Sequence, residues 1–417
     1  MRNATSRASW TVADHVLSSL SNFALSALVA RGSSPETFGR FTLVFTLYLL
    51  ALGVSRALGA EPLLSRFSAA FRWEAGAAVT GLAVALGAAA AVALGLAAAL
   101  APAGVRELLV ALALILPGLL LQDAWRYVFF AEGQPRRAML NDLVWLLSQA
   151  VVFSLLVLSH RTDALALCLG WGATGGLAAI FGCLQARLLP RPRAAWRWIR
   201  EQRDLAVRFL AESMALVGSG QLVVYGVGAS AGLAALGALR SGQIVFGPVQ
   251  MLLTATLAVA IPEGSRLVRS HPRAVPIAYA CLVLSLVGAC AAWGIVVVAL
   301  PDPWGLALLR DNWTASQSVL PGLAVSMALA AVGVAALVLL RIRGAARQSS
   351  RARLLAAALH PIGATIGAAV GDARGAVVGL AVVNAILAVF WSTFASTELR
   401  SIARSVPNSV KGAETSA

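Results

Sequence analysis

The chain is dominated by long stretches that contain no charged residue. Four of them exceed the roughly 20 apolar residues that a helix needs to cross a bilayer: Ala75–Val105, Ala274–Pro301, Asn312–Leu340 and Gly375–Thr397. Hydrophobic residues make up 59% of the sequence and charged residues only 12%, whereas an ordinary soluble domain has about 25% charged residues. We therefore expect an all-α polytopic membrane protein.

Charged breaks between the apolar runs predict about twelve transmembrane helices. With the N-terminus in the cytoplasm, most of the 33 basic residues fall in inner segments, as the positive-inside rule requires. Both termini are then cytoplasmic, and only Arg56 and Arg126 lie inside spans. The expected spans are 14–31, 38–58, 76–101, 107–131, 140–159, 163–186, 205–228, 233–261, 275–300, 315–340, 354–371 and 376–396.

A repeat of about 200 residues divides these spans into two halves. Leu116–Leu119 and Leu320–Leu323 share the sequence Leu-Pro-Gly-Leu, and each stands at the same place in its half. Two further features recur about 200 residues apart. An acidic residue opens both the first and the seventh span, and a Glu-Pro or Pro-Glu pair ends both the second and the eighth. We expect two homologous six-helix lobes around a central cavity. The predicted parts are an N-lobe (1–186), a cytoplasmic interfacial linker (187–204), a C-lobe (205–400) and a cytoplasmic tail (401–417).

The net charge of +15 changes this picture little. Every basic residue except Lys411 is arginine, and the arginines are scattered over the inner segments. This distribution is typical of residues that set membrane topology and contact anionic lipids, not of a nucleic-acid-binding surface.

The sequence around Lys411 does not match the P-loop motif, so we expect no ATP hydrolysis of the P-loop type. The four cysteines and four histidines are dispersed, so we expect no metal and no cofactor. Outer loops are short; the longest, around Pro301–Thr314, leaves no room for an external catalytic domain, so no enzyme is expected.

Polar residues follow one face of the first, fourth and eighth spans, where lipid contact would be costly. They therefore face the interior, and Pro248 predicts a kink in the eighth span. Arginines in a cavity would bind phosphate through a bidentate fork. The candidate substrate-binding residues are Arg31, Arg56, Arg126, Arg240, Asn22, Gln122, Gln243 and Gln250, and the candidate sites for a coupling ion, H⁺ or Na⁺, are Asp14, Asp123, Glu61, Glu212 and Glu263.

Structural roles for the same residues stay open. Small polar residues often stabilise the packing of membrane helices through hydrogen bonds between them. Asp123 and Arg126 could likewise form an ion pair that only packs the fourth helix against a neighbouring helix. Arginines near the outer ends of spans could extend to the headgroups, and Asp14 could cap its helix. Glu61 and Glu263 could pair with nearby arginines.

Two stretches carry a family resemblance. Asp14–Phe23, Ala30-Arg31 and Ser34–Phe41, with its Pro-Glu-x-Phe-Gly sequence, resemble the start of polysaccharide flippases. The stretch from Leu116 through Gln122, Asp123 and Arg126 to Ala138 is similar to the same group, in the multidrug/oligosaccharidyl-lipid/polysaccharide exporter (MOP) superfamily. Within the first motif, Pro35 and Gly39 are typical of a turn and a close helix approach.

The resemblance implies a V-shaped fold like that of the multidrug and toxin extrusion (MATE) transporters. It implies export of an undecaprenyl-pyrophosphate-type lipid-linked oligosaccharide across the bacterial inner membrane by alternating access, for cell-surface polysaccharide synthesis. Arg31 and Arg126 fall in the matching motifs and would engage the pyrophosphate. The expected partners are the lipid-linked substrate, membrane lipids and the polymerase or glycosyltransferases of the same pathway, with the protein itself a monomer.

Three other functions fit parts of the sequence. A MATE-type drug or cation antiporter needs an acidic, aromatic cavity for organic cations, whereas arginines rival acids inside these spans. A membrane glycan ligase or polymerase needs an acid or base near a sugar–phosphate bond, usually in a sizeable outer loop. A membrane scaffold protein that does not transport would have the same apolar spans and charge distribution, so the sequence barely distinguishes it from a transporter.

Overall fold

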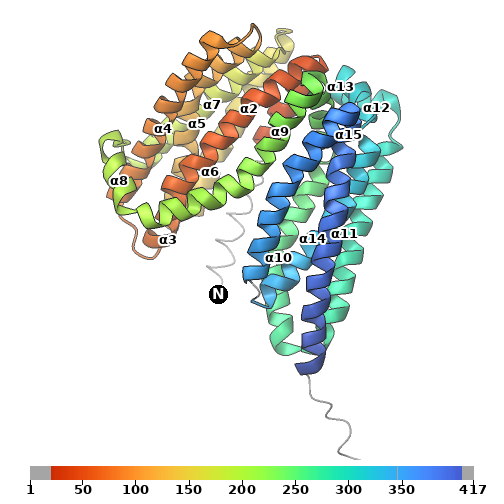
Figure 1. Ribbon diagram of the computed structural model, residues 1–417. Helices are drawn as coiled ribbons and strands as arrows, with labels where there is room; N and C mark the ends of the chain where they lie inside the picture. Colours follow the sequence, from red (N-terminus) through yellow and green to blue (C-terminus); the bar gives the residue numbers. More distant parts are fainter. Residues whose placement is uncertain (1–19, 345, 406–417) are drawn as a thin grey trace, which may run out of the picture. The chain divides into compact units, whose positions relative to one another are not determined.

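The computed structural model describes residues 20–344 and 346–405, and every regular element in those ranges is helical (Figure 1). Residues 20–32 form the described part of the first helix, while Asp14 lies outside the described residues. The all-α fold class predicted from the apolar runs is thus confirmed. The later elements are α2 (Pro35–Ser55), a π-helical turn (Arg56–Ala60), α3 (Glu61–Phe67), α4 (Trp73–Leu100), α5 (Val105–Ala131), α6 (Pro135–Leu158), α7 (Ala164–Ala186), α8 (Ala195–Glu201), α9 (Arg203–Val245), α10 (Gly247–Ser270), α11 (Val275–Val298), α12 (Asp302–Leu309), α13 (Asp311–Gln317), α14 (Leu320–Ile342) and α15 (Ala346–Ser405).

Ten helices in the described part of the chain are long and apolar enough to span a membrane. Two of them, α9 and α15, are interrupted at the boundaries that the sequence predicts between neighbouring spans. The backbone leaves the helical region at Gly232 in α9, where φ is 85°, and at Gly371 and Asp372 in α15. Each element therefore contains two helices, and the second helix of α9 is followed by α10 after a break at Phe246, next to the predicted kink at Pro248.

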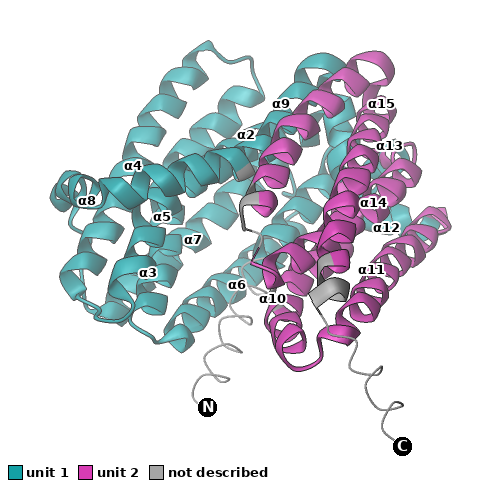
Figure 2. Ribbon diagram, turned by 60° about the horizontal axis from the view of Figure 1, so that its bottom comes forward, with its two compact units in different colours: residues 1–241, 303–315 teal, residues 242–302, 316–417 magenta. Residues whose placement is uncertain are grey.

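The chain forms two compact units, which Figure 2 colours separately. The first comprises Met1–Ser241 with Pro303–Ala315, and the second comprises Gly242–Asp302 with Ser316–Ala417. These units differ in extent from the lobes predicted on either side of the 187–204 linker, because α9 up to Ser241 packs with the first unit. The outer segment expected as a loop forms α12 and α13, most of which also belongs to the first unit.

The core of the first unit is built on α5, which packs against α4 and α7. Its largest fully buried side chains include Trp125, Trp171 and Phe129. Trp171 stands at the centre of an aromatic cluster, with its ring 5.0 Å from that of Tyr48 and 5.8 Å from that of Phe45. This packing holds α2, α5 and α7 together and fixes the position of the polar residues described below.

The start of α2 shows why the Pro-Glu-x-Phe-Gly sequence is placed there. Ser34 caps the helix, since its Oγ accepts a hydrogen bond from the backbone N–H of Thr37 at 3.3 Å. A Cβ at Gly39 would overlap the carbonyl oxygen of Leu233, and one at Gly237 would overlap that of Pro35. Two glycines therefore let the start of α2 and residues 233–241 approach backbone to backbone, in the role expected of Gly39.

A single residue of α13 ties three segments of the first unit together. The amide of Asn312, which is fully buried, donates to the carbonyl oxygens of Ala30 at 2.7 Å and Ser33 at 2.6 Å. Its oxygen accepts from the hydroxyl of Ser241 at 3.2 Å. The residue thus satisfies carbonyl groups that the first helix leaves open at its end.

The second unit is organised around α14, which packs against α10, α11 and α15. The two helices of α15 form a hairpin, because Gly367 and Gly375 approach so closely that a Cβ on either would overlap the other's carbonyl oxygen. Gly363 and Gly379 repeat this contact one turn farther from the break. Small residues at such spacing let membrane helices pack at short distance.

Candidate functional site

The candidate site in the first unit begins with a local distortion of the second predicted span. The backbone N–H of Glu61 bonds to the carbonyl of Arg56, five residues back, and closes a π-helical turn over Arg56–Ala60. Pro62 has no N–H and so cannot bond to the carbonyl of Leu58, four residues back. The indole N–H of Trp198 in α8 takes its place and donates to that carbonyl at 3.0 Å. Single π-helical turns are frequent at functional sites, and this one places Arg56.

Arg56 forms a two-pronged ion pair with Asp123 of α5. Its Nε lies 2.9 Å from Oδ2 of Asp123 and its Nη2 lies 2.7 Å from Oδ1. The guanidinium carbon also lies 5.4 Å from the ring centre of Tyr127, within cation–π range. This fork geometry is the one with which arginine binds a carboxylate or a phosphate.

A second arginine extends this pair into a buried network. Nη1 of Arg126 lies 3.3 Å from Oδ1 of Asp123, and its Nε lies 3.1 Å from Oδ2 of Asp142 in α6. Gln122 donates to Oδ1 of Asp142 at 2.7 Å and to Oδ1 of Asn141 at 3.2 Å. We call the six residues Arg56, Gln122, Asp123, Arg126, Asn141 and Asp142 the arginine–aspartate network.

The network contains two guanidinium and two carboxylate groups, so its formal charges cancel. Its members differ in exposure: the side chains of Arg126 and Asp142 are 3% and 1% exposed, whereas that of Arg56 is 33% exposed. A buried unpaired charge is very costly, which explains why each arginine has a carboxylate partner. Arg56 is therefore the cation of the network that a dissolved or membrane-borne ligand can reach.

The structure brings together four of the candidate residues, namely Arg56, Gln122, Asp123 and Arg126. Glu61 lies within electrostatic reach of Arg56 and of Glu212. The remaining candidates among the described residues lie outside the network. In the first unit, Asn22 has a buried Oδ1 with no hydrogen-bond partner among the described residues, while Arg31 and Glu212 are exposed. Arg240 and Glu61 are half-buried. In the second unit, Gln243 is half-buried, Gln250 is exposed, and exposed Glu263 forms an ion pair with Arg266 at 2.7 Å.

Asp142 and Asn141 are network members that the sequence reasoning missed. The signal was present, because an Asn-Asp pair inside an apolar span is expensive unless it has partners. A second missed contact joins α6 to the first helix: Gln149 donates through Nε2 to the carbonyl of Ser21 at 3.0 Å, and the Ser21 hydroxyl donates back to Oε1 of Gln149. These contacts place α6 beside polar residues of the first helix and of α5, two of the three spans for which the sequence predicts a polar face.

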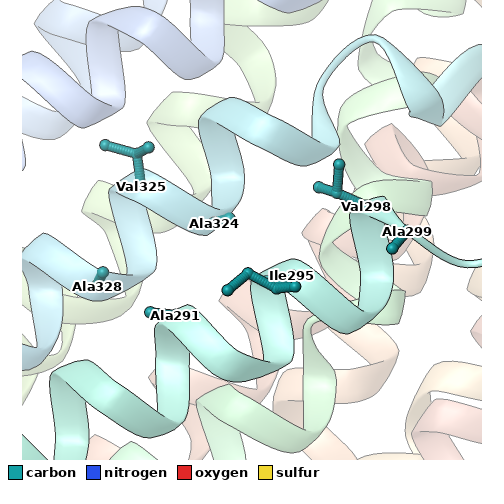
Figure 3. Close-up of a pocket in the computed structure, with 8 residues that line it drawn as sticks. Ala291, Ile295, Val298, Ala299, Ala324, Val325 and Ala328 are labelled. Carbon is teal, nitrogen blue, oxygen red and sulfur yellow. The ribbon is translucent and has the colours of Figure 1, made fainter.

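The second unit contains an apolar groove between α11 and α14 (Figure 3). It encloses about 410 Å³ and is lined only by alanine, glycine, valine and isoleucine side chains, including Ala291, Ile295, Ala324 and Ala328. Such a lining suits hydrocarbon and offers nothing to a charged group. Among the described residues no group of three or more His, Cys, Asp or Glu side chains could hold a metal ion.

No family model matches the sequence, and no curated protein is similar to it at a significant level. Solved structures are similar in fold. A multidrug resistance MATE family transporter of the MOP superfamily, in its inward-facing conformation, matches with a TM-score of 0.63 and 15% identity, over 95% of this chain and 100% of that one. The outward-facing conformation of such a transporter gives a TM-score of 0.58 and 15% identity, over 95% of each chain.

A further match is a MOP superfamily transporter from Pyrococcus furiosus, with a TM-score of 0.57 and 14% identity over 94% of each chain. That protein is described as having a binding pocket of reverse polarity that suggests a different function. Pocket charge therefore has to be argued for each chain from its own residues. These similarities, together with the helical architecture, show that the chain has the fold of MATE transporters of the MOP superfamily.

Proposed function

We propose that this protein is a multi-pass transporter that moves an anionic, lipid-linked oligosaccharide of the undecaprenyl-pyrophosphate type across the bacterial inner membrane by alternating access. The observation that carries the proposal is the partly exposed, fork-shaped guanidinium of Arg56 inside a membrane span. Support for alternating access comes from the fold, which matches both inward-facing and outward-facing transporter structures.

Substrate binding would work by exchange of anions on Arg56. In the structure Asp123 occupies the fork, so the site is neutral before substrate arrives. A phosphate oxygen pair has the same bidentate geometry and can replace the carboxylate. Asp123 keeps its contact with Arg126 at 3.3 Å, which limits the cost of the exchange.

The exchange also supplies a place for a coupling ion. Once phosphate holds Arg56, the two carboxylates of the network share only Arg126. A carboxylate that loses a cation in a low-dielectric region becomes easier to neutralise with a proton. Of the candidate ion sites, we therefore favour Asp123, and the ion it would take is H⁺.

The lipid part of the substrate needs only hydrocarbon surroundings. The saccharide would meet the polar residues of the first helix, including Asn22, whose Oδ1 has no hydrogen-bond partner in the described part of the chain. The prenyl chain would stay in the bilayer or in apolar grooves such as that between α11 and α14. The proposal requires no cofactor beyond the ion gradient, and its partners would be membrane lipids and the enzymes that make and polymerise the saccharide.

The test is transport of a fluorescent undecaprenyl-pyrophosphate-linked saccharide by purified protein in proteoliposomes. Arg56→Lys keeps the charge but loses the fork, so we expect about a tenfold lower rate, equivalent to one charge-assisted hydrogen bond of about 1.5 kcal/mol. Arg56→Gln should abolish transport. Arg266→Gln, which breaks only the exposed pair with Glu263, is the matched control and should transport normally. Normal transport by a folded Arg56→Gln variant would overturn the proposal.

The main alternative is a MATE-type antiporter for drugs or organic cations. The observation that favours it is the presence of buried carboxylates, Asp123 and Asp142, close to the aromatic side chains of Tyr48 and Tyr127. An organic cation would then replace Arg56 on Asp123. In the same vesicles, efflux of ethidium that is lost in Asp123→Asn and retained in Arg56→Gln, with no movement of the lipid-linked saccharide, would establish this alternative.

A further inference from the structure

A second polar cluster lies within the helices of the second unit. It consists of Ser326 in α14, His360 in the first helix of α15 and Asn384 in the second. His360 is nine residues from Arg351 and eleven from Gly371, which correspond to roughly 14 Å and 16 Å along a helix. An ionisable residue at such a depth in a span is a functional site by default, because hydrocarbon penalises its charged form.

Both ring nitrogens of His360 face oxygen atoms. Nδ1 lies 2.7 Å from the carbonyl oxygen of Ala356, one turn back on the same helix. Nε2 lies 3.0 Å from Oδ1 of Asn384. A backbone carbonyl can only accept a hydrogen bond, so Nδ1 must carry a proton.

The orientation of the Asn384 amide is set from the opposite side. Its Nδ2 donates to the Ser326 hydroxyl at 2.9 Å and to the Ser326 carbonyl oxygen at 3.3 Å. Turning the amide over would let the Ser326 hydroxyl donate to Oδ1, but it would also bring Oδ1 against the Ser326 carbonyl oxygen, acceptor against acceptor. The observed orientation presents an acceptor to Nε2, which suits a ring protonated on both nitrogens, whereas a neutral ring with its proton on Nδ1 needs the turned-over amide.

The charged residues around His360 lie too far along their helices to explain the contacts of its ring. Along α14 there is no acidic or basic residue before Arg341, and the second helix of α15 has none between Arg374 and Glu398. In the first helix of α15 and the break that follows it, the charged residues nearest to His360 in sequence are Arg353 and Asp372, seven and twelve residues away. The short 3-10 helix Pro272–Ala274, which contacts α15, carries Arg273. The titratable groups of α11 are Tyr279 and two cysteines, and the charged residues of α10, namely Glu263, Arg266 and Arg269, lie near the end of that helix.

We propose that His360 is a proton-binding site in the second unit and that Asn384 transmits its protonation state to α14 through Ser326. The imidazolium takes one proton from water onto Nε2 and releases it again, with no other bond made or broken. When the ring is neutral, Nε2 has a lone pair and needs a donor, so the Asn384 amide turns over and its contact with the Ser326 carbonyl is lost. Pro361, directly after His360, removes a backbone hydrogen bond and lets the helix bend at this point.

The proton site is tested without any substrate, by nuclear magnetic resonance of protein labelled with ¹⁵N-histidine in lipid nanodiscs. The chain has four histidines, and His360→Gln identifies the signal of interest by its loss. We expect both ring nitrogens of His360 to carry protons in the acidic range and only Nδ1 in the alkaline range, between pH 5 and pH 9. A ring that keeps one protonation state over this whole range would overturn the proposal.

Transmission to α14 is tested by hydrogen–deuterium exchange of peptides from 320–342, measured at pH 6 and pH 8. Intrinsic exchange rates cancel when each value is divided by that of His360→Gln at the same pH. We expect this ratio to change between the two pH values in the wild type and in His160→Gln, the matched control in a loop, but not in Asn384→Leu. A ratio that still changes in Asn384→Leu, or that is constant in the wild type, would contradict transmission through Asn384.

A coupling role for the proton rests on the proposed transport function and has its own readout. Vesicles with an imposed pH gradient should transport the lipid-linked saccharide about tenfold more slowly with His360→Gln than with His160→Gln, within the usual range of coupling energies. Equal gradient-driven rates in the two variants would remove the coupling role. A protein that moves no saccharide at all would instead refute the proposed function, while the magnetic resonance result would still decide the proton site.

Discussion

The Arg126–Asp142 pair gives the sharpest test of the charge balance in the arginine–aspartate network. Asp142→Asn keeps the shape of the side chain and an oxygen that Gln122 can still bond, so only the charge is lost. Two guanidinium groups then share Asp123, and the network has an uncompensated positive charge. Because Arg126 is 3% exposed, water cannot screen that charge.

The magnitude follows from the geometry. At the observed 3.1 Å between Nε of Arg126 and Oδ2 of Asp142, the attraction is about 5 kcal/mol at an effective dielectric constant of about 20. Breaking a buried pair by removing one partner costs about 3–5 kcal/mol. For a unit of roughly 250 residues this corresponds to a melting temperature lower by about 6–20 °C.

The assay is thermal unfolding of the detergent-solubilised protein at a fixed scan rate. The matched control is Glu263→Gln, which breaks an ion pair whose side chains are 69% and 62% exposed and should change stability by less than about 1 kcal/mol. The double variant Arg126→Met with Asp142→Asn removes both charges and leaves the Arg56–Asp123 pair neutral. The double variant should therefore have a higher melting temperature than either Arg126→Met or Asp142→Asn alone.

Two results would refute this reasoning. The first is an Asp142→Asn variant as stable as the wild type, which would mean that the pair is solvated and contributes nothing. The second is a double variant less stable than both single variants, which would mean that packing rather than charge sets the cost.

Three further predictions concern packing, and each is measured as a melting temperature. Asn312→Ala leaves a buried carbonyl oxygen, that of Ala30, and a part-buried one, that of Ser33, without their donor and should cost about 2–4 kcal/mol of stability. Asn312→Asp keeps the shape but loses the donor, so it should be destabilised at least as much. Gly367→Ala should destabilise the α15 hairpin by about 1–3 kcal/mol, while Gly288→Ala, where a Cβ has nothing within 4 Å, should be neutral or stabilising. Trp198→Phe should cost about 1–3 kcal/mol because the carbonyl of Leu58 loses its donor, and an unchanged melting temperature would show that another group satisfies that carbonyl.

The helical fold could be predicted from the sequence because hydrocarbon imposes a simple rule. A spanning segment must satisfy its own backbone hydrogen bonds and must be apolar over about 20 residues, so the uncharged runs mark helices directly. The breaks between helices could also be predicted from the sequence where glycine permits a backbone conformation that other residues disfavour. Gly232, with its φ of 85°, is an example. The extent of the two units was not readable, because it depends on which helices pack together and not on any local pattern.

The candidate site was predictable only in part, for a related reason. Helical spacing places Gln122, Asp123 and Arg126 on one face of α5, and the cost of charge in a membrane indicates that this face is buried. Which partner each charge meets is a matter of contacts between helices distant in sequence, such as Arg56 with Asp123, 67 residues apart. The same limit applies to His360, whose isolated position in the sequence gave no hint of Asn384.

The two polar clusters differ in a way that bears on how a transport cycle can be driven. A guanidinium never loses its proton under biological conditions, so Arg56 provides a permanent charge that can exchange one anion for another but cannot itself sense pH. Imidazole is the side chain whose charge changes near neutral pH, and at His360 each charge state requires its own orientation of the Asn384 amide. Under the two proposals, Arg56 makes binding depend on substrate charge, while Asp123 and His360 make the direction of transport depend on the proton gradient. If both proposals hold, substitution at Arg56 should alter the apparent substrate affinity at every pH, whereas substitution at His360 should alter only the dependence of the rate on the gradient.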